Sequence, residues 1–181
     1  CDWEETPTVF LKELLGELER QLADRGLQLY VPEEYAFCTK KAGLLVSSAL
    51  CGGSLERLKE GLERFGPDRL VLALQRSAED FQLPAPEGRG RILKEEELKQ
   101  MLRERQPGVF FSRELCARYF TYVDRRGQPH FVLFDDGDTM ARKLEVGRGA
   151  GVRCFAAVWP EICDAADRMG LQTVRTGQGR R

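Results

Sequence analysis

The sequence predicts an α/β protein built around a parallel sheet. Two observations lead to this prediction. Apolar runs of strand length alternate with amphipathic segments of helix length, and the best of these runs is apolar throughout rather than at every second position. Unbroken apolar runs are typical of strands covered on both faces, and strand–helix alternation requires right-handed crossovers within a parallel sheet. The pattern alone fits both an eight-stranded α/β barrel and an open, doubly wound sheet.

The first elements are a helix and two strands. A helix is predicted over Thr8–Arg25, because leucines recur there at helical spacing between charged residues, and Gly26 is expected to end it. A short strand is predicted over 27–31. The run 42–50 is small and apolar, and is long enough for a buried parallel strand.

The next helix–strand pair is the clearest in the chain. A helix is predicted to begin at Ser54 and to end before Gly66, with its leucines on one face. Gly52-Gly53-Ser54 is interpreted as a turn and helix cap, although a glycine pair before a helix could also cradle a phosphate. Arg69–Leu74, RLVLAL, is the strongest strand signal in the sequence.

The regular alternation pauses between residues 81 and 108. Residues 84–91 are rich in proline and glycine and predict a loop, and 94–105 predict a charged helix. Strands at 119–122 and 130–134 flank a turn at Arg125-Arg126-Gly127 and predict a β-hairpin. The single histidine, His130, is expected to lie at the surface without a partner.

The C-terminal part returns to helix–strand alternation. A helix is predicted over 139–149 with Asp138 as its cap, followed by a strand over 152–159 and a helix over 160–169. Asp135 and Asp136 are of the type that binds metals. Because a helix follows at once, capping and the helix dipole explain them better.

Composition excludes several classes of function. With 28 basic and 29 acidic residues the net charge is -1, so nucleic acid is not an expected partner. No apolar run reaches the roughly 18 residues of a membrane span. No signal peptide is visible, and the compartment stays open between bacterial cytoplasm and cell envelope. The six cysteines fit neither a zinc pattern nor a disulfide framework, so neither a metal nor a cofactor is predicted.

Four segments, in order along the chain, resemble the glycoside hydrolases of family 18. Asp2-Trp3-Glu4 is similar to the end of that family's D-x-x-D-x-D-W-E signature, and the helix–strand segment 8–32 resembles its fourth helix and fifth strand. Residues 67–83 are similar to its P-x-K-L-V-L-G-x-P-x-Y-G-R-x-W-x-L stretch. Residues 131–161 resemble V-x-F-D-D-x-x-S-x-x-x-K followed by a strand ending in Trp.

The resemblance implies a partial (β/α)8, or TIM-type, barrel. Residues 1–175 would run from the end of barrel strand four to strand eight, with an inserted hairpin or α+β segment at about 81–134, and 176–181 would be a frayed tail. A half barrel exposes two sheet edges. We therefore expect a missing N-terminal half, or another subunit, to complete it.

The resemblance also implies a chemistry. The family hydrolyses β-1,4-linked N-acetylglucosamine polymers with retention, the sugar's own acetamido oxygen acting as nucleophile. Glu4 would then be the acid/base, Asp2 would orient the acetamido group, and Trp159 would form the floor under the sugar. On a strand, the spacing of Asp2 and Glu4 puts both on one face. The expected ligand is a glycan or amino-sugar oligomer.

Two departures from the family pattern leave an alternative open. Ser47 and Ser48 stand roughly where the family has Tyr and Asp, and Gln75-Arg76 stand where it has Pro and an aromatic residue. Ser48 and Gln75 are therefore candidate substrate-binding residues of a more polar pocket. The alternative is a catalytically degenerate barrel that binds carbohydrate without turnover. A third reading is an unrelated open α/β domain that binds a phosphorylated metabolite at Gly52-Gly53.

Overall fold

The computed structural model describes residues 5–49, 54–85 and 90–171 of the 181, without the side chains of 5–8, 54 and 55. The described chain forms two compact units. Residues 5–48, 54–74 and 146–156 belong to the first, and 49, 75–145 and 157–171 belong to the second. Each unit is described by itself.

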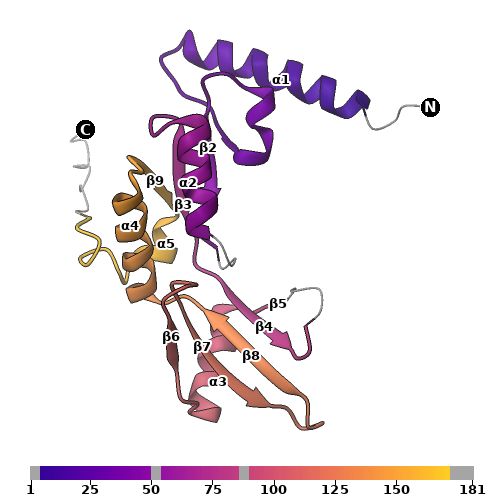
Figure 1. Ribbon diagram of the computed structural model, residues 1–181, viewed down its shortest axis with the longest axis vertical. Coiled ribbons are helices and arrows are strands. Elements are labelled where there is room, and N and C mark those ends of the chain that lie inside the picture. Colours follow the sequence, from indigo (N-terminus) through magenta and orange to yellow (C-terminus); the bar gives the residue numbers. More distant parts are fainter. Residues whose placement is uncertain (1–4, 50–53, 86–89, 172–181) are drawn as a thin grey trace, which may run out of the picture. The chain divides into compact units, whose positions relative to one another are not determined.

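The first unit is built on a four-stranded sheet in the order β1-β2-β3-β9 (Figure 1). Its strands are β1 (Tyr30–Pro32), β2 (Gly43–Ser47), β3 (Leu70–Leu74) and β9 (Cys154–Ala157). Strands β1 and β2, and β2 and β3, pair in parallel. The predicted parallel sheet is therefore confirmed. Among the described residues the sheet is open, with β1 and β9 at its edges.

The core of the first unit lies where the apolar runs predict it. Leu44 and Leu70 are 0% exposed, and Val46, Val71 and Leu74 are buried beside them. Helix α2 (Ser54–Phe65) lies close to β3 at Gly61, where a Cβ atom would be 2.6 Å from Leu70 Cδ1. A side chain at position 61 would require the end of the Leu70 side chain to shift.

Helix α1 (Glu5–Ala23) begins three residues before the predicted start at Thr8. It ends at Ala23, two residues before the predicted end at Arg25, and Gly26, with a left-handed φ of 70°, closes the turn that follows. The Glu19 carboxylate of α1 accepts hydrogen bonds from the backbone N–H groups of Lys41 (2.7 Å) and Ala42 (2.6 Å). This joins the helix to the start of β2, after the short 3-10 helix η1 (Glu33–Cys38).

The apolar face predicted for α1 is largely uncovered within the described chain. Val9 is 55% exposed, Leu14 43% and Leu18 38%, whereas Leu15 packs against the cluster around Leu44. The amphipathic pattern thus correctly predicted a helix. It did not predict how little of its apolar face would be buried.

The second unit is a five-stranded antiparallel sheet in the order β5-β4-β8-β7-β6. Its strands are β4 (Ala78–Gln82), β5 (Arg91–Ile92), β6 (Phe110–Ser112), β7 (Ala117–Val123) and β8 (Pro129–Phe134). The predicted hairpin is confirmed as β7 and β8, which pair from Arg118↔Phe134 to Val123↔Pro129. Strands β4, β5 and β6 were not predicted.

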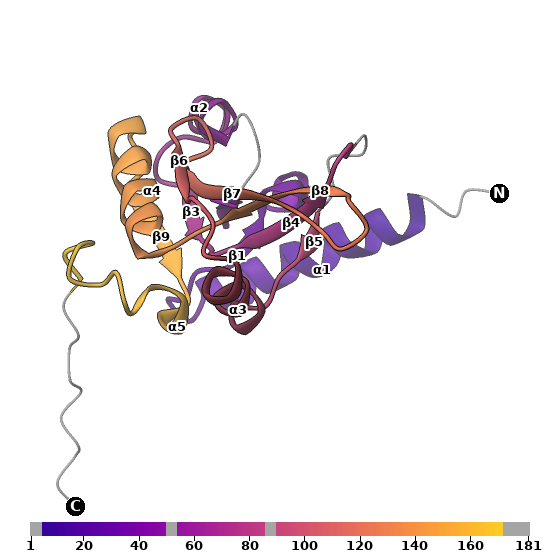
Figure 2. The same cartoon turned by 90° about the horizontal axis from the view of Figure 1, so that it is seen from below.

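Helix α3 (Glu95–Arg105) covers one face of this sheet (Figure 2). The core between them is formed by Phe120 and Val132, both 0% exposed, with Phe134, Leu93 and Leu98. The opposite face carries a row of aromatic rings across four strands: Phe110, Tyr119, Phe131 and Phe81.

The last two helices are α4 (Gly137–Ala150), which precedes β9 in the sequence, and α5 (Trp159–Ile162), which follows it. The N-terminal part of α4 belongs to the second unit and its last residues to the first. The predicted helix over 160–169 is wrong in extent, because after Ile162 the chain continues as turns to Gly170.

Candidate functional site

The residues proposed for substrate binding follow the carboxyl ends of strands. Ser48 comes directly after β2 and is buried, and Gln75 comes directly after β3 and is exposed. Trp159 opens α5 and is 48% exposed. Active sites of barrel proteins are built at this end of their strands. Asp2, Glu4, Gly52 and Gly53 lie outside the described residues.

A buried ionic cluster lies at the carboxyl end of β8. It is centred on Asp135, whose side chain is 0% exposed. Its Oδ2 accepts a hydrogen bond from Lys143 Nζ at 2.8 Å, and Lys143 is itself only 7% exposed. Oδ1 accepts a hydrogen bond from the Thr139 hydroxyl, with an oxygen–oxygen distance of 2.8 Å. The backbone N–H of Ser77 donates to Oδ2, with a nitrogen–oxygen distance of 3.2 Å. A single carboxylate thus joins the start of β4, the end of β8 and helix α4.

The adjacent Asp136 caps α4. Its Oδ1 accepts the Thr139 N–H at 2.9 Å, while the Asp136 N–H donates to Thr139 Oγ1 at 2.9 Å. The prediction of Asp138 as the cap is therefore wrong. Asp138 instead pairs with Arg118 at 3.0 Å and with Arg168. Arg118 also pairs with Asp136, and these pairs raise the pKa of its guanidinium.

These contacts give a physical reason for the F-D-D-x-x-S-x-x-x-K spacing, which reads FDDGDTMARK here. Asp135, Thr139 and Lys143 are four residues apart, so they lie on one face of a helical path. Ser or Thr supplies the hydroxyl and Lys the counter-charge. The capping and dipole interpretation holds for Asp136, whereas Asp135 acts as the buried partner of Lys143.

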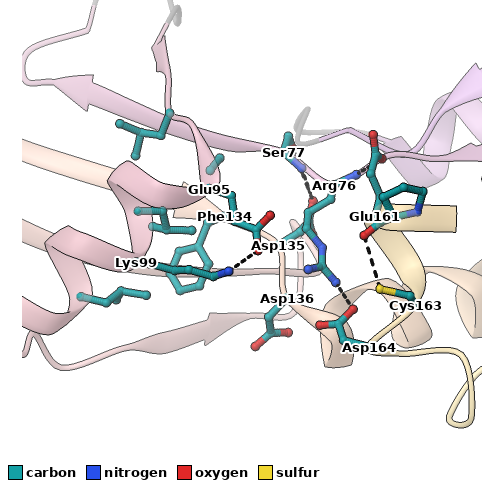
Figure 3. A pocket seen from close by; sticks show the side chains of 15 residues that line it. Arg76, Ser77, Glu95, Lys99, Phe134, Asp135, Asp136, Glu161, Cys163 and Asp164 are labelled. Atoms are coloured by element: carbon teal, nitrogen blue, oxygen red, sulfur yellow. Dashed lines mark hydrogen bonds and ion pairs between the residues drawn. The ribbon is translucent and has the colours of Figure 1, made fainter. Parts of the chain in front are cut away.

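The second unit also holds a pocket of about 560 Å³ (Figure 3). Its apolar wall is formed by residues of β4, β8 and α3 and by one residue between β5 and α3: Ala78, Phe134, Leu98, Leu102 and Leu93. Its polar rim comes from the β3–β4 link, α3, the β8–α4 link and the start of the C-terminal segment: Arg76, Ser77, Glu95, Lys99, Asp135, Asp136, Glu161, Cys163 and Asp164.

Arg76 organises one side of this pocket. Its Nη2 donates to Asp164 Oδ1 at 2.6 Å, and its backbone N–H donates to Glu161 Oε2 at 3.1 Å. Across the rim Lys99 pairs with Glu95 at 2.5 Å, and this hydrogen bond lowers the pKa of Glu95. No spacing in the sequence links these residues, because they come from three separate segments.

A second polar cluster lies between the antiparallel sheet and α3. Asp80, 5% exposed, accepts a hydrogen bond from the Tyr122 hydroxyl at 2.8 Å and lies 2.8 Å from His130 Nδ1. The rings of Tyr122 and His130 stack with centroids 4.5 Å apart, and Arg105 lies over Tyr122. The prediction of a partnerless surface His130 is therefore wrong: its side chain is 13% exposed.

This cluster predicts an alkaline loss of stability. Burial, and then the hydrogen bond to Asp80, raise the pKa of Tyr122 to about 12. Since the folded value lies above the ordinary value of about 10, the stabilisation is complete below pH ~10 and is lost as pH rises towards ~12. Urea unfolding across this range should show a steeper decline for the wild type than for Tyr122→Phe. Parallel declines would contradict the assignment.

Two absences concern the described residues only. No group of three or more His, Cys, Asp or Glu side chains is arranged there to hold a metal ion. Over the same ranges, no helix has both the length and the apolar character needed to cross a bilayer.

Comparison with known proteins shows that the fold of this chain is similar to that of several solved structures. No protein-family model matches the sequence, and no curated protein matches it. Among solved structures, a chitinase from Chromobacterium violaceum is 15% identical with a TM-score of 0.67, over 88% of this chain and 59% of that one. The spore cortex-lytic enzyme SleL from Bacillus megaterium is 12% identical, with a TM-score of 0.57, over 84% and 41%.

A chitinase-like agglutinin from Robinia pseudoacacia is 13% identical with a TM-score of 0.55, over 90% of this chain and 63% of that one. The chain thus spans 41% to 63% of the length of these three structures. At such identities the likeness concerns the fold: a mixed α/β arrangement that is also found in chitinases and spore cortex-lytic glycosidases.

Proposed function

We propose that this chain is part of a glycoside hydrolase-like protein that acts on β-1,4-linked N-acetylglucosamine-containing glycans by substrate-assisted, retaining hydrolysis. The observation that carries the proposal is the fold, which a chitinase structure shares over 88% of this chain. The Asp135–Thr139–Lys143 cluster supports it, because these residues of the motif that resembles the family form buried structural contacts.

The roles follow from the resemblance. Glu4 is the proposed general acid and base, Asp2 orients the acetamido group, and Trp159 supports the apolar face of the sugar. Ser48 and Gln75, which follow β2 and β3, are the proposed polar contacts to the substrate. The half-exposed indole of Trp159 is compatible with stacking on a ligand.

The proposal includes a partial barrel. The open edge of β1 and the uncovered apolar face of α1 would be covered by further polypeptide, either an N-terminal half or another subunit. A soluble, stable monomer of these 181 residues in light scattering would count against this part of the proposal.

Replacing Trp159 by alanine tests the sugar-binding role. Loss of one aromatic contact should weaken binding of N-acetylglucosamine oligomers about tenfold, because such stacking is typically worth ~1 kcal/mol or more. Titration calorimetry on the full-length protein measures this, with Phe110→Ala as the matched control. Phe110 is also an exposed aromatic residue, at 59%, but lies on the antiparallel sheet. Equal affinities of wild type and Trp159→Ala would contradict the proposed site.

A second candidate function is binding of the same glycans without turnover. Ser48 and Gln75 favour it, because the family carries residues at these strand ends that stabilise charge and close the pocket. Losing one stabiliser of transition-state charge can cost about 10²–10³ in rate. The similar structure from Robinia pseudoacacia is described as an agglutinin, which is a name for a binding protein, and it provides a precedent for this function on a similar fold. Saturable binding of the oligomers without any cleavage product would favour this function over hydrolysis.

A further inference from the structure

Among the residues that the structure describes, the pocket of the second unit contains one carboxylate without a cationic partner. Glu161 accepts the Arg76 N–H at its Oε2, and within the described chain no Lys, Arg or His nitrogen lies within 4.0 Å of the carboxylate. The other acidic residues that line the pocket are each paired with a basic one: Asp164 with Arg76, Glu95 with Lys99, Asp135 with Lys143 and Asp136 with Arg118. Counted over the described residues, the pocket therefore has a surplus of one negative charge.

The same pocket has an apolar wall. Leu93 and Phe134 are each 5% exposed and Leu98 is 8% exposed, and all three line the same pocket as Glu161. A ligand that filled the pocket from this wall to Glu161 would remove water from the carboxylate. Because an unpaired carboxylate is costly to desolvate, a cationic group on the ligand would offset that cost.

We propose that this pocket binds a ligand with a primary ammonium group attached to an apolar body. Glu161 Oε2 accepts the Arg76 N–H, and a compact ammonium can bind through Oε1 alone, whereas a planar guanidinium binds best through both oxygens. The apolar body lies against Leu93, Leu98 and Phe134. A volume of about 560 Å³ falls within the range of ordinary small-ligand pockets.

The lining of this pocket differs from the proposed sugar-binding residues, although Gln75 and Trp159 are next in sequence to Arg76 and Pro160 of the lining. None of the proposed sugar-binding residues, Trp159, Gln75 and Ser48, lines the pocket. The same chemistry occurs in free alkyl or aryl amines and in the side chain of a lysine within a peptide. The ammonium on an apolar stem is the feature that both share.

Calorimetry with phenethylamine tests the site on the folded chain, with phenethyl alcohol and hydrocinnamate as probes of similar shape. The expected order of affinity is amine, then alcohol, then carboxylate. Glu161→Gln should weaken amine binding about tenfold, the typical effect of losing a charge-assisted hydrogen bond. The glutamine can still accept the Arg76 N–H, so the fold should be retained, and circular dichroism checks this.

A second variant acts in the opposite direction. Lys99→Gln leaves Glu95 unpaired at the rim, and since both side chains are 57% exposed the fold should tolerate it. Its affinity for phenethylamine should rise about threefold, as expected for a surface charge. Glu145→Gln, on the exposed side of α4 and 63% exposed, is the matched control and should bind like the wild type.

The proposal is overturned if Glu161→Gln binds phenethylamine as tightly as the wild type, or if hydrocinnamate binds as well as the amine. Absence of amine binding by the folded protein at ~10 mM ligand would also overturn it. A lysine blocked at both ends by acetyl and methylamide groups separates the two sources. Tighter binding than phenethylamine assigns the site to peptide lysines and weaker binding to free amines, and either result supports the ammonium site.

Discussion

Lys143→Met is expected to lower the free energy of unfolding by about 3–5 kcal/mol, because it leaves the buried carboxylate of Asp135 without its counter-charge. The Asp135 side chain is 0% exposed and that of Lys143 7%, so water cannot replace the lost ammonium. The remaining donors, Thr139 and Ser77, satisfy hydrogen bonds but supply no charge. Urea unfolding monitored by circular dichroism measures the loss.

Arg142→Met is the matched control for this prediction. Arg142 precedes Lys143 on α4, but it is 60% exposed and pairs with Glu145 at the surface. Such a pair contributes about 0–1 kcal/mol. The double variant Asp135→Asn, Lys143→Met should recover much of the lost stability, since no buried charge is left. A Lys143→Met protein within ~1 kcal/mol of the wild type would refute the role given to the cluster.

Glu4→Gln is expected to reduce hydrolysis of N-acetylglucosamine oligomers by about 10²–10⁴-fold, the usual contribution of a general acid and base. The reason is chemical: an amide cannot protonate the glycosidic oxygen, although it has nearly the same shape as the carboxyl group. Product release from the oligomers by the full-length protein is the measurement. Oligomer affinity should change little, because Glu4 is proposed to move a proton.

Glu13→Gln provides the control, as an exposed glutamate of α1 with no proposed role. Undiminished hydrolysis by Glu4→Gln would remove the residue from the mechanism. If the wild type itself releases no product but binds the oligomers, the binding function described above replaces the hydrolytic one.

The elements that the sequence predicted correctly are those with a strong local pattern. RLVLAL is apolar throughout and forms β3, and the helical spacing of leucines between charges is enough to predict α1 and α2. Gly26 and Gly66 end these helices, because each takes a left-handed φ that other residues rarely adopt. In each case the information lies within a few neighbouring residues.

The missed elements depend on partners far along the chain. Strand β4, AEDFQ, has little apolar periodicity, and it is a strand because it pairs with β8, Phe81 opposite Phe131. His130 is mostly buried for the same reason, since its carboxylate partner Asp80 is 50 residues away in sequence. No local pattern could have indicated either contact.

The sequence predicted where the candidate site residues lie along the chain, but not which side chains contact one another. The two parallel strands β2 and β3 were correctly located, and Ser48 and Gln75 directly follow them. The pocket around Arg76 and Glu161 was not predicted, since it joins residues 85 positions apart. Asp138 was expected as the helix cap, but Asp136 takes that role because the capping geometry requires an acceptor three residues before Thr139.

The arrangement of Asp135, Thr139 and Lys143 bears on how such sequences are classified. A signature made of a carboxylate, a hydroxyl and an ammonium looks like reaction machinery, yet here every polar atom of it holds a helix against a sheet. A protein that had lost all turnover would still require these three residues in order to fold. The structural role of these residues therefore explains the signature, and a test for activity has to begin elsewhere in the chain.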